Sequence, residues 1–450
     1  MKRSEFIRLM GLGAAGALVP GTLRKSRPID FKRRIVIVGA GMAGIAAART
    51  LVDAGHEVVI LEARERLGGR IWTDRSLGAT LDLGGGMINH AKDNGLTRIV
   101  SQHRQSVHPL DPESYDLYDG RGNSYEQDPL ENLSEWLEKL YRRAAKYIEK
   151  QEDDLSMRTA LESVLQEGQL SPQRRRELEW RISLEELGLG TTIDRVSAKW
   201  GHSMRFGGDH LYLPNGFDKV LEKMARGLDI RYGQEVRIIK HKNGVASALT
   251  LDDDHEGDFV IVTLPLGVLK QQKIRFFPKM SYAKANAVNK LGVGLTNKVA
   301  LRFDRAFWPR DRQFLNYMSK YKGEFPNFFN LAHFNKKPVL LASVSREFGA
   351  AVEDQPDIEV AVQIHRILYK IFEDAPMPNA YLVSRWGSDP YARGAFSYLP
   401  VGTDPVLRDY LAKPEGRIYY AGEATVRQHA GRLQGAYLSG LRAAKWIMAR

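Results

Sequence analysis

A glycine-rich turn near the start of the chain constrains its fold more than any other feature. Residues 35–38 form an apolar, β-branched run typical of a buried parallel strand, and Gly39-Ala-Gly41-Met-Ala-Gly44 follows it directly. Glycines at this spacing allow a tight turn, the approach of a pyrophosphate, and close packing of the next helix, expected over 45–54. The N–H groups at the start of that helix would face the phosphates.

A second strand supports a dinucleotide site. The run Glu57–Leu61 is again apolar and β-branched, and Glu62 follows it about 20 residues beyond the glycines, where such folds place an acid on a ribose hydroxyl. The glycine pattern alone would also suit an ordinary strand-to-helix turn. Because the second strand and the acid are both present, we expect an α/β, Rossmann-like domain that binds a dinucleotide.

Four further segments indicate which dinucleotide binds. Residues 63–70 read Ala-Arg-Glu-Arg-Leu-Gly-Gly-Arg, and residues 81–86 read Leu-Asp-Leu-Gly-Gly-Gly. Near the other end, residues 418–425 read Ile-Tyr-Tyr-Ala-Gly-Glu-Ala-Thr, and residues 431–436 read Gly-Arg-Leu-Gln-Gly-Ala. An arginine in such a turn can pair with phosphate. Small residues let the start of a helix approach a flat ring, and its positive dipole end suits a ring that gains negative charge on reduction.

These segments resemble the FAD-binding fingerprints of the flavin-containing amine oxidases, which include monoamine and polyamine oxidases, histone lysine demethylases and L-amino-acid oxidases. The resemblance implies a glutathione-reductase-type FAD-binding domain, with Val236 beside the adenine and Glu423 on the ribityl chain. The chain has no cysteine, so the FAD cannot be attached through a cysteinyl bond and is expected to be noncovalent. The implied FAD-binding residues are Gly39, Gly41, Met42, Ala43, Gly44, Glu62, Ala63, Arg64, Gly69, Arg70, Gly84, Gly85, Gly86, Met87, Val236, Gly422, Glu423, Gly431, Arg432, Leu433, Gln434, Gly435 and Ala436.

The resemblance covers residues 33–90 and 205–450 and implies two interleaved domains. We expect a discontinuous FAD-binding domain and an α+β substrate domain built from its insertions. The FAD-binding domain is expected over 31–90, 205–290 and 395–450, and the substrate domain over 91–204 and 291–394. Apolar spacing predicts helices over 130–150, 171–187 and 218–225, a terminal helix with Tyr437, Leu441, Ala444 and Met448 on its apolar face, and strands over 235–240, 258–265, 298–303, 339–344 and 381–384.

The N-terminal segment, residues 1–30, predicts an export signal or a disordered N-terminus. It begins Met-Lys-Arg-Ser, and residues 11–20 are a short, weakly apolar stretch rich in glycine and alanine. The start resembles a twin-arginine signal with Ser4 in place of the second arginine, which favours a periplasmic or secreted protein over the cytoplasmic alternative. The lack of cysteine fits an oxidising compartment. No apolar run reaches the length of a transmembrane helix.

The basic charge does not indicate nucleic-acid binding. The net charge is +12, but residues 1–34 alone hold nine basic and two acidic residues. The rest of the chain is therefore only mildly basic, as is common for an enzyme surface, and we expect no nucleic-acid partner.

Lys298 interrupts an apolar strand pattern and is the candidate catalytic residue. Burying an ammonium group is costly unless it is hydrogen-bonded or functional. Periodicity alone favours a solvent-facing lysine on an edge strand, whereas the resemblance implies a lysine that holds a water beside flavin N5. Trp386 and Phe396 are implied to line the substrate pocket, and a core position for Trp386 is compatible with that role.

The predicted pocket departs from the family pattern at two positions. Arg432 occupies the place of the second aromatic ring that frames the amine in many members, and Met87 occupies that of the arginine that binds carboxylate in L-amino-acid oxidases. A cation facing the substrate repels a protonated amine unless the substrate also carries an anion. Arg432 would then bind a carboxylate, or it would pair with an internal acid such as Glu423.

The resemblance thus implies an FAD-dependent amine oxidase acting on a small amine or amino-acid-like substrate. Hydride would pass from the carbon bearing nitrogen to flavin N5, and oxygen would reoxidise the flavin with release of peroxide. Three alternatives stay open: an L-amino-acid oxidase that uses Arg432 as a carboxylate clamp, a desaturase or porphyrinogen-type oxidase, against which Lys298 argues, and a flavin-binding protein without turnover. The sequence does not indicate an oligomeric state.

Overall fold

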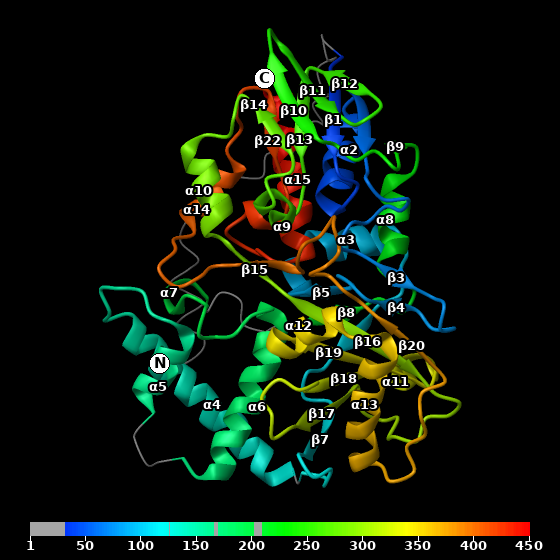
Figure 1. Ribbon diagram of the computed structural model, residues 1–450, viewed down its shortest axis with the longest axis vertical. Helices are drawn as coiled ribbons and strands as arrows, with labels where there is room; N and C mark the ends of the chain where they lie inside the picture. Colours follow the sequence, from blue (N-terminus) through cyan, green and yellow to red (C-terminus); the bar gives the residue numbers. More distant parts are fainter. Residues whose placement is uncertain (1–31, 126, 166–169, 202–208) are drawn as a thin grey trace, which may run out of the picture. The chain divides into compact units, whose positions relative to one another are not determined.

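The computed structural model (Figure 1) describes residues 32–125, 127–165, 170–201 and 209–450. The predicted export signal, residues 1–30, lies outside the described residues, as do residues 205–208 of the predicted FAD-binding domain. The export signal and the domain boundaries therefore stay predictions. In the described part of the chain, no helix is both long enough and apolar enough to span a bilayer.

Within the described residues, five parallel strands drawn from three distant parts of the chain form one sheet. Its order is β22 (Ile418–Tyr420), β13 (Phe259–Val262), β1 (Arg34–Val38), β2 (Glu57–Leu61) and β9 (Asp229–Arg231). All four pairings are parallel. The central strand is buried from its second residue onward, as expected for a parallel sheet covered on both faces. This is the predicted Rossmann-like sheet, and the strand predicted over 57–61 has the observed bounds.

Two helices pack together on this sheet, α2 (Met42–Asp53) and α15 (Leu433–Met448). They approach through small residues, because a Cβ atom on Gly440 would lie 2.2 Å from the carbonyl oxygen of Ala43. The predicted apolar face of α15 is wrong at Met448, which is 39% exposed. Its buried face instead follows the small side chains that allow the close contact: Gly435, Ser439, Gly440, Ala443 and Ala444, with Gln434 and Ile447.

A four-stranded sheet and several short helices belong to the same parts of the chain as the parallel sheet. The sheet has the order β12 (Asp254–Gly257), β11 (Val245–Leu249), β10 (Ile238–Lys242) and β14 (Arg275–Phe277) in the described chain. The strand predicted from Glu235 starts only at Ile238, because the preceding residues run along the cavity described below. The helices here are α8 (Asp218–Ala225), with its predicted bounds, α9 (Leu266–Lys270), α10 (Tyr282–Lys290) and α14 (Val406–Ala412).

A six-stranded mixed sheet is the second large sheet of the described residues. Its order is β20 (Ala380–Val383), β16 (Thr296–Arg302), β19 (Val339–Ser345), β18 (Asn327–Asn330), β17 (Phe314–Met318) and β7 (Tyr115–Asp119). The three predicted strands, β16, β19 and β20, are its neighbours at one side. Helices α11 (Leu331–Asn335) and α12 (Arg346–Asp354) contact this sheet at β19, and α13 (Asp357–Ile371) contacts it at β20.

The other elements of the described chain are helices and short strands. Helices α4 (Gln127–Ile148) and α6 (Pro172–Leu189) lie where helices were predicted, and α6 starts at a capping Ser171 and ends at Gly190, which has a positive φ. The remaining elements are α3 (Gly95–Gln102), α5 (Met157–Val164), α7 (Ala198–Gly201), β3 (Thr73–Asp74), β4 (Leu81–Asp82), β5 (Met87–Asn89), β6 (His108–Leu110), β8 (His210–Tyr212), β15 (Gly292–Gly294), β21 (Phe396–Tyr398), η1 (Ala91–Asp93) and η3 (Glu423–Thr425).

Candidate active site

A cavity of about 960 Å³ brings the predicted segments together. Three predicted residues, Gly44, Gln434 and Gly435, are not among its described lining residues. A Cβ atom on Gly44 would lie 2.0 Å from the carbonyl oxygen of Gly39, so this glycine serves helix packing, as the motif predicts. The predicted residues that line the cavity are Gly39, Gly41, Met42, Ala43, Glu62, Ala63, Arg64, Gly69, Arg70, Gly84, Gly85, Gly86, Met87, Val236, Lys298, Trp386, Phe396, Gly422, Glu423, Gly431, Arg432, Leu433 and Ala436.

The first turn presents bare backbone to the cavity. Gly39 has φ +107°, a conformation that side chains rarely adopt, and its Cβ would lie 2.6 Å from Thr263 Oγ1. At Gly41 the nearest atom to a Cβ is 3.8 Å away, so a ligand can approach the main chain. Helix α2 then begins without a side-chain cap and without an acid in its first turn. Its N-terminal N–H groups are therefore available to an anion.

Glu62 holds the turns on either side of it in place. Its Oε2 accepts a hydrogen bond from the N–H of Ala40 at 2.8 Å, and its Oε1 accepts one from the N–H of Arg64 at 3.0 Å. The side chain lines the cavity although the residue is buried. Each carboxylate oxygen has a further lone pair, so the predicted bond to a ribose hydroxyl is still available.

The arginines of the 63–70 segment have protein partners. Arg64 pairs with Asp389 at 2.7 Å. Arg70, expected to pair with phosphate, donates through Nη1 to Glu423 Oε1 at 3.0 Å and to the Ala395 carbonyl at 2.8 Å. Arg66 was not predicted; it donates to the carbonyls of Gly69 and Ile71, and burial lowers its pKa to about 10. Three cations therefore shape this loop through contacts within the protein.

Glu423 lies buried at the centre of a hydrogen-bonded group. Besides Arg70, it accepts bonds from the Ser397 hydroxyl at 2.6 Å and from the Gly431 N–H at 2.9 Å. Burial alone would raise the pKa of Glu423, but Arg70 and the Ser397 hydroxyl hold it below its usual value. Among the described residues its ion-pair partner is Arg70, not Arg432 as considered from the sequence.

Lys298 projects from β16 into the cavity wall. Its Nζ donates to the carbonyl oxygen of Asp82 at 2.7 Å and to that of Gly84 at 3.0 Å. Burial lowers the pKa of Lys298, and the nearby Asp82 carboxyl opposes that shift. An ammonium group has three donors, so one N–H of Lys298, which lines the cavity, is left without a partner among the described residues. The solvent-facing alternative considered from the sequence is therefore wrong.

Asp82, which anchors Lys298 through its carbonyl but does not line the cavity, was not singled out from the sequence. Its carboxyl accepts a bond from the Thr73 hydroxyl at 2.5 Å, while its Oδ2 is buried without a hydrogen-bond partner. Burial raises the pKa of Asp82 to about 6, against the opposing effects of Thr73 and Lys298. Its place in the strand pattern gave no sign of this burial.

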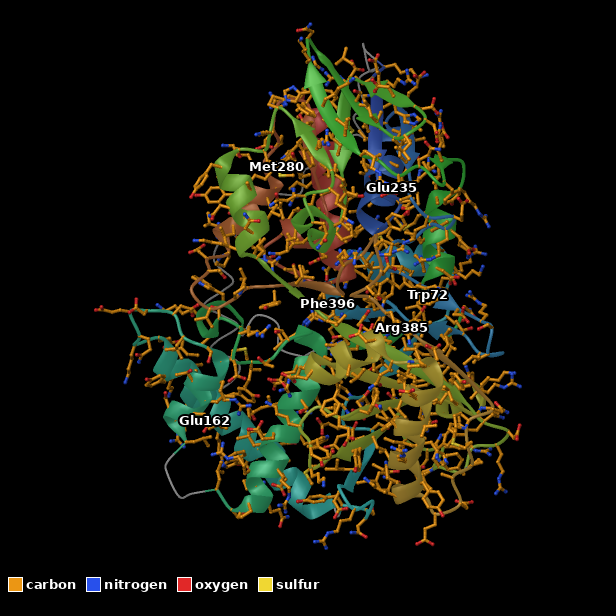
Figure 2. All side chains as sticks on the ribbon, in the orientation of Figure 1. Trp72, Glu162, Glu235, Met280, Arg385 and Phe396 are labelled. Atoms are coloured by element: carbon orange, nitrogen blue, oxygen red, sulfur yellow. The ribbon has the colours of Figure 1, made fainter. Side chains whose placement is uncertain are left out.

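Aromatic rings close the cavity beside Lys298. The Trp386 indole N–H donates to the Leu83 carbonyl at 3.1 Å, and the ring meets Trp72 edge-on with centroids 6.1 Å apart. Trp386 is buried and also lines the cavity, so its two predicted roles are compatible. Figure 2 marks Trp72 and Phe396 between the parallel sheet above and the mixed sheet below, where Phe396 starts β21.

Arg432 lies at the start of α15, next to the turn that Lys298 binds. A Cβ atom on Gly85 would lie 3.0 Å from Leu433 Cδ2, which fixes Arg432 close to the 84–86 turn. Burial lowers the pKa of Arg432. His210, which sequence reasoning missed, lines the same cavity and contacts Asn89 Oδ1 through Nδ1 at 2.9 Å; burial and then Arg432 lower its pKa.

Other lining residues carried no motif that would have identified them. Many of them come from β17, β18, β19, α4, α6 and the loop before β10. Glu235 belongs to that loop and is marked in Figure 2. The polar and charged ones from these elements are Ser134, Glu138, Tyr141, Arg181, Glu185, Gln234, Glu235, Arg237, Asn316, Asn327 and Ser343, and further ones from other parts of the chain are Glu113, Thr263, Gln271, Lys273, Thr296, Tyr391 and Arg393.

The cavity fits FAD. Two helices, α2 and α15, start at its wall without side-chain caps, so they can receive a pyrophosphate and the electron-rich edge of a flavin. Gln234 lines the cavity, and its side-chain oxygen is buried without a hydrogen-bond partner among the described residues. At Gly422, with φ +133°, a Cβ would meet nothing within 4 Å.

Comparisons with known proteins agree with this geometry. The family described as flavin containing amine oxidoreductase matches residues 42–448. The chain is 34% identical over 430 residues to polyamine oxidase 2 of Arabidopsis thaliana, covering 91% of this chain and 87% of the relative. Similarity to polyamine oxidase 4 of Oryza sativa is 33% over 426 residues, with the same coverage. Human lysine-specific histone demethylase 2 is 31% identical, over 99% of this chain and 57% of its own length.

Solved structures show the same fold. Wild-type putrescine oxidase bound to putrescine superimposes with a TM-score of 0.77 at 23% identity, covering 93% of this chain and all of the other. The predicted α/β fold with an FAD-binding Rossmann-type domain is confirmed. On the extent of the family match and the identity to its members, the chain belongs to the flavin containing amine oxidoreductases and is an FAD-dependent oxidoreductase of the amine oxidase type.

Proposed function

We propose that the protein oxidises the C–N bond of a small amine and passes the electrons to oxygen, with release of hydrogen peroxide. The observation that carries this proposal is Lys298, which lines the cavity and whose ammonium group is anchored by two main-chain carbonyls and keeps one N–H that no described residue bonds. A lysine fixed in this way can hold one water in a constant place, because the anchoring bonds remove its freedom to turn.

When bound, FAD supplies the two-electron acceptor for hydride from the carbon bearing nitrogen, and oxygen then reoxidises it. The chain's own residues bind the cofactor and the substrate and orient them. The uncapped N-termini of α2 and α15 favour negative charge, and Glu62 and Glu423 offer acceptors to hydroxyl groups. Trp386 and Phe396 keep bulk water away from the reacting carbon.

The charge of the site favours the neutral form of the amine. Lys298 and Arg432 both line the cavity, and a protonated amine beside them would be repelled. Removal of hydride requires the nitrogen lone pair, so a site that disfavours the ammonium form also prepares the reactive form. The lining also includes Glu113, Glu138 on α4 and Glu185 on α6. These acids suit a second, cationic amino group of the same substrate.

The substrate class that this arrangement supports first is a polyamine, in line with the names of the relatives. The test is peroxide release from purified protein with spermine, spermidine and putrescine, and with amino acids beside the amines formed by their decarboxylation. Anaerobic loss of the oxidised-flavin absorbance, followed by its return in air, identifies true substrates. If no amine bleaches the flavin while a chemical reductant does, the proposal is wrong and a flavin-binding protein without turnover is favoured.

Arg432 favours a second candidate, an L-amino-acid oxidase. The guanidinium lies partly desolvated at the cavity wall, where a bidentate bond to a carboxylate would gain more than in water. Faster turnover of amino acids than of the matched amines would support it. Turnover that is indifferent to Lys298→Met would instead favour a desaturase or porphyrinogen-type oxidase.

We also propose that residues 1–30 direct export to the periplasm or the medium. The basic start and the apolar stretch that follows it support this proposal. Fractionation of cells that express the full chain, and of cells that express it from residue 31, tests it. The full chain should leave the cytoplasm with bound FAD, and equal retention of both forms would contradict it.

A further inference from the structure

We propose that Arg408, on α14, is a positioning residue for FAD: through the Ser397 hydroxyl it keeps Glu423 ionised and aimed at the cofactor. This inference rests on the proposed placement of the ribityl chain at Glu423. It adds a residue that does not line the cavity and that no sequence motif marked.

Arg408 is enclosed directly behind the cofactor loop. The residue is 1% exposed, and its Nη1 donates to Ser397 Oγ at 2.8 Å and to the Ala424 carbonyl at 3.2 Å. Ser397 is itself fully buried, and its Oγ lies 2.6 Å from Glu423 Oε2. The three side chains therefore form one continuous buried row that ends at the cavity wall.

The chemistry of the donors fixes the direction of this row. A guanidinium has donors only, so Ser397 Oγ must accept from Arg408. The single hydroxyl proton of Ser397 is then left to donate to Glu423, whose Oε2 also receives the N–H of Gly431. Without Arg408 the hydroxyl could rotate and donate elsewhere. Arg408 thus sets the orientation of a group that it does not touch.

The charges around Glu423 also support a role for Arg408 in keeping this carboxyl ionised. Among the described residues the cations facing it are Arg70 at the cavity and Arg408 behind it. The carboxylate between these two guanidiniums loses one of its two compensating charges if Arg408 is replaced. Burial would then raise the Glu423 pKa with less opposition, so the carboxyl would take up a proton at a higher pH.

A second buried arginine provides a matched control. Arg442, on α15, holds the same loop through the carbonyls of Thr425 at 2.8 Å and Tyr420 at 3.2 Å. Its bonds go to the main chain and to the Thr425 hydroxyl, not to Ser397, and the acid that faces it is Asp409. Replacing Arg442 therefore weakens the loop without breaking the row that ends at Glu423.

The test measures the Kd of apoprotein for FAD by flavin fluorescence over a pH series from about 5 to 8. Wild type should bind nearly equally across the series. Arg408→Met should lose affinity on acidification at a higher pH than wild type, because each unit by which the Glu423 pKa rises moves the loss by one pH unit and corresponds to about tenfold in Kd at the acidic end. Arg408→Lys, which keeps the charge, should restore most of the affinity. Arg442→Met should lower the melting temperature but leave the Kd independent of pH.

A double substitution separates the inference from the placement on which it rests. If Arg408 acts through Glu423, Arg408→Met should add less than about threefold to the Kd in a Glu423→Gln background. If Arg408→Met does not fold, Ser397→Ala breaks the same row and should give the same pH dependence. A pH-independent Kd in both variants, or the same pH dependence in Arg442→Met, overturns the role of Arg408. If Glu423→Gln itself leaves FAD binding unchanged, the placement of the ribityl chain is wrong.

Discussion

Replacing Lys298 with methionine removes the group on which the proposed chemistry depends while keeping the length of the side chain. The ammonium donates to two carbonyls and keeps a third N–H without a partner in the described part of the chain. Loss of one preorganised donor at a reacting centre typically costs about 2.7–4 kcal/mol, or about 10²–10³ in rate. We expect flavin reduction or reoxidation to slow at least tenfold, since a water held by other groups would retain part of the effect.

The same change also has a structural cost that must be separated from catalysis. It leaves the carbonyls of Asp82 and Gly84 without their donor, at about 1–3 kcal/mol for each buried group. FAD should stay bound, because Lys298 bonds two carbonyls of the 82–84 turn, and the glycine turn at 39–44 and Glu62 keep their contacts. A surface lysine, Lys240, which pairs with Asp254 at 2.8 Å, gives the matched control Lys240→Met with unchanged rates.

Stopped-flow absorbance measures both half-reactions. Anaerobic mixing with substrate gives the rate of flavin reduction, and mixing the reduced protein with oxygenated buffer gives the rate of reoxidation. Flavin content and melting temperature show that the variant is folded and loaded. If both rates equal those of wild type, Lys298 does not act at the reacting centre, and the reasoning from its anchored third donor is refuted.

Three further predictions concern cofactor, substrate and stability. Denaturation should release all FAD from the yellow protein, and Glu62→Ala should weaken FAD binding by about 1.5–3 kcal/mol in a fluorescence titration; colour that stays on the precipitate would contradict noncovalent binding. Arg432→Tyr should shift relative kcat/KM from acid-bearing amines toward plain amines. If the wild type already prefers plain amines and the variant keeps that preference, Arg432 has a structural role only. Because burial raises the Asp82 pKa from 3.8 to about 6, the folded state holds this proton longer than the unfolded state, so the contribution of Asp82 to stability falls by about 3 kcal/mol as pH rises through that window. Denaturant unfolding at both ends of the window should therefore show a more favourable change with pH for Asp82→Asn than for wild type, and an equal change would refute this.

Local features of the fold could be predicted because their signals are local. The strand at 57–61 and the helix at 218–225 have their predicted bounds, and the glycines after β1 serve the turn and the packing that their spacing indicates. Neighbouring residues determine both patterns, so no knowledge of distant parts is needed. The start of β10 was placed three residues early, because residues 235–237 have a strand-like composition but lie along the cavity.

The partners of the charged side chains could not be predicted, because tertiary packing decides them. Arg70 meets Glu423, which is 353 residues away in the sequence, a partner that its turn did not suggest. Periodicity favoured solvent for Lys298, whose anchoring carbonyls lie 214 and 216 residues earlier. Arg408 has no motif at all. The glycine motifs predicted where the site lies, whereas the partners of its charged side chains are known only from the folded structure.

The most direct test of the central claim is an anaerobic titration of the purified protein with a polyamine, followed by admission of air. The account predicts that the oxidised-flavin absorbance disappears as substrate is added and returns with oxygen. It also predicts one peroxide for each C–N bond oxidised. The imine formed should be recovered, after hydrolysis, as a carbonyl compound and an amine. A flavin that dithionite reduces but that no polyamine, simple amine or amino acid bleaches would contradict the account.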